Sequence, residues 1–123
     1  MSIDWTKLKT AEQLAQEQLA ANKEKALKAA KSEYDQAIKL LVNDAPYSEI
    51  ASWDKQEQEA RALLADSTAS TPFIDKLVLA RGLGETREIL AGKIVANADI
   101  YASEAARLLG EYQKKVKEIE AIV

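Results

Sequence analysis

The sequence has 123 residues, a formal net charge of −3, and 47% hydrophobic residues. This length fits one domain with a modest core, and the composition is typical of an ordinary globular protein. The sequence contains no Cys, which excludes a disulfide framework and a thiol nucleophile, and no His, which removes the usual proton shuttle and the commonest metal ligand. We therefore expect no catalytic residues, no cofactor and no metal site.

Two further classes of protein are disfavoured. The first 13 residues lack the apolar stretch of a secretory signal, and no window approaches the roughly 18 apolar residues of a membrane-spanning helix. Residues 44–66 contain two basic and six acidic residues, while the charges elsewhere nearly balance. This weak acidic patch is unlike a nucleic-acid footprint. We expect a cytoplasmic protein that contacts neither membrane nor nucleic acid.

The first long helix is predicted from Thr10 to about Asn43. Thr10 followed by Gln13 forms a capping-box pattern, and no Pro or Gly interrupts the region after it. The first half has only Leu14 and Leu19 as large apolar residues, so we expect it to be exposed or to pair with another chain, including a second copy. In the second half, residues on one helical face form a stripe: Leu27, Ala30, Tyr34, Ala37, Ile38 and Leu41.

The second helix follows the turn sequence NDAPY, in which Pro46 disfavours helical backbone at the residue before it. We expect Ser48 to cap this helix and the helix to end at Asp66. Its apolar face is predicted to consist of Ile50, Trp53, Ala60 and Leu63 or Leu64. Trp53 has two readings: it anchors the helix on the core, or it is an exposed anchor for a partner, since Trp is enriched at interface hot spots.

A short helix is predicted over Pro72–Arg81. Thr71 suits the N-cap, Pro72 the first turn, and Gly82 the left-handed position after the last turn. So short a helix needs packing to hold it. We expect Phe73, Leu77 and Ala80 to face the core, with Ile74 and Val78 beside them. Leu79 falls on the outer side, and Leu83 lies just beyond the helix.

The last helix is predicted to begin near Glu85 and Glu88, whose charges complement the helix dipole, and to continue to the C-terminus. Gly110 alone costs about 1 kcal/mol relative to Ala, too little to end it. Its apolar stripe has steps of three or four residues: Leu90, Ile94, Ala98, Tyr101, Ala105, Leu108, Tyr112, Val116 and Ile119. The four helices predict an all-α protein with an extended N-terminal helix and arm over residues 1–43 and a compact helical domain over residues 44–123.

Two groups of polar residues are candidates for catalytic or metal-binding sites. Asp54, Glu57 and Glu59 lie near one another on the second helix, but without His they are best interpreted as a solvated acidic face. The hydroxyl residues between 67 and 71 have no base to activate them and are best interpreted as caps and linkers.

Residues 52–113 resemble the C-terminal region of small proteins from the tail-fibre gene clusters of tailed bacteriophages and prophages. The likeness is carried by the patterns W-x-x-Q-x-x-E-A, T-P followed by two hydrophobic residues and D, and A-R-G before a long Ala-rich helix. The opening IDWTKLKTAEQ is similar to the lead-in of such proteins. The matching positions are Trp53, Gln56, Glu59, Ala60, Thr71, Pro72, Phe73, Ile74, Asp75, Ala80, Arg81 and Gly82.

The resemblance implies a non-catalytic tail-fibre assembly chaperone or accessory tail protein that binds a trimeric fibre chain. It would act in the host cytoplasm during assembly or remain in the virion tail. The alternative is a small acidic phage-encoded inhibitor or regulator of a host protein. In either case we expect large apolar side chains outside the core to contact the partner, as exposed apolar patches often mark interaction sites. The candidates are Trp53, Leu79, Leu83, Leu14 and Leu19.

Overall fold

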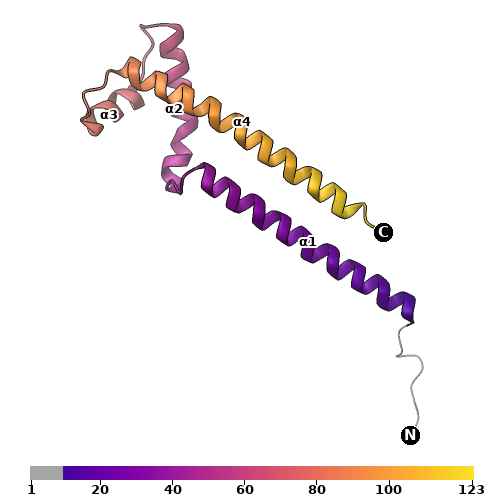
Figure 1. Cartoon of the computed structure of the whole chain (residues 1–123). Helices are drawn as coiled ribbons and strands as arrows, with labels where there is room; N and C mark the ends of the chain where they lie inside the picture. The colour runs from indigo at the N-terminus through magenta and orange to yellow at the C-terminus, as the bar shows by residue number, and fades with distance from the viewer. Residues whose placement is uncertain (1–9) are drawn as a thin grey trace. The chain divides into compact units, whose positions relative to one another are not determined.

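A computed structural model describes residues 10–123, and every regular element in that range is an α-helix (Figure 1). The helices are α1 (Ala11–Leu41), α2 (Tyr47–Ala65), α3 (Pro72–Arg81) and α4 (Arg87–Glu120). The predicted all-α fold with long first and last helices is confirmed. The lead-in and the arm up to residue 9 lie outside the described residues.

The described chain divides into two compact units, and the points of division fall within α1 and α4. The terminal unit comprises residues 10–37 and Leu108–Val123, and the central unit comprises Ile38–Arg107. The boundary predicted at residue 43 stays a prediction.

The terminal unit is an antiparallel pair of helical stretches from α1 and α4. The rings of Tyr34 and Tyr112 stack with centroids 5.0 Å apart. Glu33 and Lys115 form an ion pair at 2.7 Å, which raises the pKa of Lys115 because the carboxylate accepts a hydrogen bond from the ammonium. Ala30 is the one fully buried residue among those described in this unit. The pair therefore depends on half-buried side chains.

The start of α1 confirms two predictions. The backbone N–H of Gln13 donates to Thr10 Oγ1 at 3.0 Å, and Gln13 Oε1 accepts from the backbone N–H of Thr10 at 2.9 Å. This is the predicted capping box. All positions from 10 to 18 are exposed, as expected from their few large apolar side chains.

The core of the central unit is built where α2, α3 and α4 meet. Its fully buried hydrophobic residues are Ala60, Leu63, Ile74, Leu90 and Ala91. Leu77, Val78, Ile94 and Val95 pack against them and are partly buried. Of the two leucines left open on α2, Leu63 is the core residue and Leu64 is exposed.

The predicted inner face of α3 was wrong by about one position. Ile74 is 0% exposed, whereas Phe73 is 36% exposed and Ala80 is also exposed. The sequence pattern was ambiguous because apolar residues occupy most of this short helix. The inner face of α3 is decided by its neighbours, because the buried residues of α2 and α4 pack around Ile74.

The turn between α1 and α2 is tight and left-handed. Asn43 and Asp44 both have φ of 53°, a conformation that Asn and Asp tolerate better than most residues. Pro46 takes the N-cap position of α2 without a side-chain hydrogen bond. The prediction that Ser48 caps this helix was wrong, since Pro46 begins it two residues earlier.

The stripes predicted on the long helices are confirmed. Every stripe position on α1 and α4 is buried or partly buried. The helix α4 continues through Gly110 to Glu120, as expected. Its N-terminus is capped by Thr86, whose Oγ1 accepts from the backbone N–H of Ile89 at 3.2 Å.

Candidate functional site: a groove in the central unit

The acidic residues of α2 do not form one solvated face. The side chain of Glu59 is 5% exposed, and its carboxylate accepts from the backbone N–H groups of Phe73 at 3.2 Å and Ile74 at 3.0 Å. A carboxylate there satisfies two N–H groups that the first turn of α3 leaves without helical partners, and it complements the helix dipole. The interpretation of Glu59 as solvated was therefore wrong: this residue caps α3 from α2.

A second polar contact fixes the loop before α3. Arg87 donates to the carbonyl oxygens of Ser67 at 2.8 Å and Ala69 at 3.1 Å, and to Thr71 Oγ1 at 3.2 Å. The Thr71 hydroxyl in turn donates to Asp75 at 2.8 Å. Hence Thr71 is the N-cap residue of α3 but makes no side-chain hydrogen bond to the helix backbone.

The end of α3 is joined to α4 by charge. Gly82 has φ of 63° at the C-cap, as predicted. Glu85 accepts from Lys93 at 2.7 Å and from Arg81 at 2.8 Å. These hydrogen bonds lower the pKa of Glu85, with the bond from Lys93 the larger cause and the bond from Arg81 the next. These contacts hold the three helices of the central unit in one arrangement.

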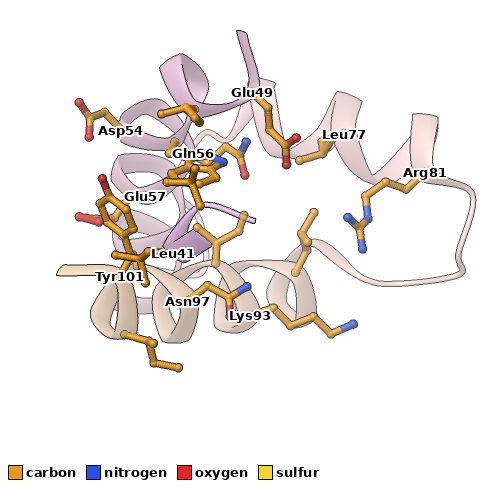
Figure 2. Close-up of a pocket in the computed structure, with 17 residues that line it drawn as sticks. Leu41, Glu49, Asp54, Gln56, Glu57, Leu77, Arg81, Lys93, Asn97 and Tyr101 are labelled. Atoms are coloured by element: carbon orange, nitrogen blue, oxygen red, sulfur yellow. The ribbon is translucent and has the colours of Figure 1, made fainter. Parts of the chain in front are cut away.

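A groove of about 670 Å³ opens between these helices and the end of α1 (Figure 2). All its lining residues belong to the central unit. Its apolar lining comes from Leu41, Val42, Ile50, Trp53, Leu77, Leu90, Ile94, Ala98, Ile100 and Tyr101. Polar and charged side chains complete it: Glu49, Asp54, Gln56, Glu57, Arg81, Lys93 and Asn97. A space of this size lies in the range of ligand pockets, which are mostly apolar with a few polar groups.

The aromatic part of the groove joins α2 to α4. The rings of Trp53 and Tyr101 meet edge to face, with centroids 5.5 Å apart and planes at 73°. Both side chains are partly buried and both line the groove. The two readings of Trp53 are thus combined, because it anchors α2 on α4 while part of it borders the groove.

The other predicted partner-binding residues do not line the groove. Leu79 is 79% exposed, and Leu83 is also exposed beyond the end of α3. Leu14 and Leu19 belong to the terminal unit, where Leu14 is exposed and Leu19 is partly buried. Within the central unit, the groove therefore includes Trp53 but neither Leu79 nor Leu83.

Sequence reasoning assigned several groove residues to the core. Ile94 and Tyr101 were recognised as stripe positions on α4, and Ile50 as part of the α2 face. Periodicity marks a residue as facing inward but cannot show that neighbouring helices leave a gap in front of it. Ile100 falls outside the stripe, is 62% exposed and still lines the groove. The sequence signal for it is a large apolar residue off the stripe and next to Tyr101.

Glu57 of the groove shares an ion-pair network with two residues that do not line it, Arg61 and Asp99. Arg61 forms ion pairs with Asp99 at 2.6 Å and Glu57 at 3.4 Å, and these bonds raise its pKa, with Asp99 the larger cause. Among residues 10–123, no three His, Cys, Asp or Glu side chains are grouped so that they could hold a metal ion. None of the helices described has a stretch long and apolar enough to cross a membrane.

Comparison with known proteins yields no match: no family model fits the chain, and no curated protein and no solved structure is found to be similar to it.

Proposed function

We propose that this chain is a non-catalytic protein-binding module whose groove holds a segment of another polypeptide. The observation that supports this proposal is the Trp53–Tyr101 pair, which lines an open groove of mixed apolar and polar character. Large aromatic side chains at the centre of a pocket provide much of the binding free energy at protein interfaces. A lining of both apolar and charged side chains also matches the usual composition of such interfaces.

The resemblance of residues 52–113 to phage tail-fibre proteins suggests the partner. We propose a fibre chain, bound during assembly or in the tail. The matching positions support a scaffold role for much of the shared pattern, since Glu59, Ala60, Thr71 and Ile74 are buried at the α2–α3 junction. On this proposal, the junction sets the spacing of the helices, and the groove beside it makes the contact.

The alternative of a small acidic inhibitor is less well supported. It depended on the acidic middle segment, in which Glu59 proves to be a buried cap and Glu57 is paired with Arg61. Of the acidic residues of α2, Glu49 and Asp54 remain as its unpaired acidic surface within the described residues.

The proposal is tested by co-expressing the full chain with the fibre chain encoded beside it and measuring co-purification. Two matched variants separate the surfaces. Ile100→Asp places a charge in the groove, and Leu79→Asp places the same charge on the outer side of α3. Both positions are largely exposed, so neither variant should unfold the protein.

We expect Ile100→Asp to abolish co-purification and Leu79→Asp to leave it unchanged, with the same circular-dichroism spectrum and melting temperature for both. Loss of binding only in Leu79→Asp would show that the partner contacts the outer surface of α3 and not the groove. Absence of co-purification with the unsubstituted chain would contradict the fibre as the partner.

A further inference from the structure

The charged side chains that line the groove are divided by sign between the helices, with the acidic ones on α2 and the basic ones on α3 and α4. Glu49, Asp54 and Glu57 all come from α2. Arg81 from α3 and Lys93 from α4 supply the basic side chains. In Figure 2, Glu49 lies beside Leu77, apart from Asp54 and Glu57.

The basic side chains of the groove are partly neutralised within the chain, because one carboxylate offsets one of their two charges. Arg81 Nε and Lys93 Nζ donate to the two oxygens of a single carboxylate, that of Glu85, at 2.8 and 2.7 Å. Glu85 itself does not line the groove. Its negative charge is thus shared by the two cations, and their attraction for an acidic partner is reduced.

The acidic side chains of the groove keep more of their charge. Glu57 is paired with Arg61, but that guanidinium also binds Asp99, at the shorter distance of 2.6 Å. Within residues 10–123, neither Glu49 nor Asp54 has a side-chain ion pair or hydrogen bond. The α2 wall of the groove therefore presents two unpaired carboxylates, Glu49 and Asp54, among the residues described.

The backbone of the groove walls favours one type of partner segment. The walls are helices, whose backbone N–H and C=O groups are bonded internally, so they offer no sheet edge to which an extended strand could add. A helical partner satisfies its own backbone and can lay an apolar face into such a groove.

We propose that the groove binds a basic amphipathic helix, with its apolar face on Trp53 and Tyr101 and its Lys or Arg side chains along α2. This inference depends on the proposed protein-binding function of the groove. Complementary charge at the edge of an interface raises the association rate and selects the partner. The two unpaired carboxylates Glu49 and Asp54 are therefore specificity-determining residues.

The test uses the full chain with Trp5→Phe, which leaves Trp53 as the sole tryptophan and makes its emission a report on the groove. Two synthetic peptides of about 14 residues, near the length at which an isolated helix becomes marginally stable, serve as probes. They share one leucine face and differ only in whether Lys or Glu flanks it. We expect the Lys peptide to change the Trp53 emission to saturation, with a Kd at least about tenfold lower than that of the Glu peptide.

The variant pair Glu49→Gln with Asp54→Asn removes both unpaired charges and breaks no ion pair among residues 10–123. Glu12→Gln with Asp35→Asn is the matched control, because it changes the net charge equally at two exposed positions of α1. We expect the groove pair to weaken binding of the Lys peptide about 3- to 10-fold and the control pair to change it less than twofold. Added salt should weaken binding to the unsubstituted chain more than to the groove pair.

The outcomes separate the inference from the function on which it depends. Equal affinity for both peptides, or equal weakening by both variant pairs, overturns the charge selection while leaving a protein-binding groove. Failure of both peptides to perturb Trp53 overturns the helix-binding inference as well. In that case co-purification of the fibre chain, and its loss in Ile100→Asp, still decides the proposed function independently.

Discussion

The central and terminal units use the same two long helices but bury them very differently. In the central unit, α2 and α3 pack against α4 and enclose a cluster that includes the fully buried Ile74 and Ala91. In the terminal unit, Ala30 is the one fully buried residue among those described, and the contact includes a tyrosine stack and the Glu33–Lys115 ion pair. The apolar stripes of α1 and α4 are equally regular in both units. The periodicity of a helix thus predicts which side faces inward, but the number of partner helices decides how completely that side is buried.

The largest effect is expected at the centre of the central unit. Ile74→Ala removes a fully buried side chain, so it should lower the free energy of unfolding by about 2–5 kcal/mol, through lost burial and the cavity left behind. Urea unfolding followed by circular dichroism would measure this loss. The neighbouring Phe73→Ala is the control, because 36% exposure should make its effect smaller. A larger loss for Phe73 than for Ile74 would restore the inner face predicted from the sequence.

A smaller effect is expected at the cap of α3. Glu59→Gln keeps the size of the side chain but leaves one of the two backbone N–H groups, those of Phe73 and Ile74, without a carboxylate oxygen. We expect a loss of about 1–3 kcal/mol in the free energy of unfolding. Glu57→Gln, two residues earlier on α2, alters a partly exposed pair with Arg61 and should change stability by less than about 1 kcal/mol. Equal losses in the two variants would contradict the buried-cap role of Glu59.

The sequence allowed the four helices, their order and most of their boundaries to be predicted. Caps and turns carried this success: Thr10 with Gln13, Pro72 and Gly82 each act through local backbone geometry. One error was local, the cap of α2 at Ser48 instead of Pro46, and the others concern contacts between residues far apart in the chain. Glu59 and the first turn of α3 are 14 and 15 residues apart, and no local pattern distinguishes a buried carboxylate from a solvated one.

The groove could be predicted only in part, for the same reason. Trp53 was recognised as an unusual residue on an acidic helix, and Tyr101 as a stripe position. Their contact, and the gap beside it, depend on how far α2, α4 and the end of α1 stand apart. Near the groove, α2, α3 and α4 are joined by contacts between residues separated in sequence, such as those of Arg87 and Glu59, which no local pattern predicts.

The tyrosine pair should contribute less to the free energy of unfolding than Ile74 or Glu59 does in the central unit. Tyr34 and Tyr112 are partly buried and their rings stack at 5.0 Å. A double-mutant cycle with Tyr34→Ala and Tyr112→Ala should give a coupling free energy of about 0.5–1.5 kcal/mol. A coupling indistinguishable from zero would mean that the terminal unit is held by its ion pairs instead.

Acid should weaken the contact between α3 and α4. The hydrogen bonds from Lys93 and Arg81 hold the pKa of Glu85 below its ordinary value of 4.5, so the folded state binds this proton less readily than the unfolded state does. The stabilisation is therefore present above about pH 5 and is lost as the pH falls through the lowered pKa. Urea unfolding of the unsubstituted chain and of Glu85→Gln at pH 7, 5, 4 and 3 should show a difference that shrinks toward zero. A difference that persists at pH 3 would show that the carboxylate charge is not its cause.

The smallest effect is expected on the outer side of α3. Leu79 is 79% exposed, so Leu79→Asp exchanges one solvated side chain for another and should change the free energy of unfolding by less than about 0.5 kcal/mol. Leu77, two positions earlier, packs partly against the core, and Leu77→Ala should lower stability by roughly 1–3 kcal/mol. Measured in the same urea titration, the two variants compare opposite sides of one ten-residue helix. If Leu79→Asp is the more destabilising, something covers the outer side of α3 in solution. An exposed leucine that tolerates Asp in the isolated chain, but not in the complex with a fibre chain, would instead identify a second contact surface outside the groove.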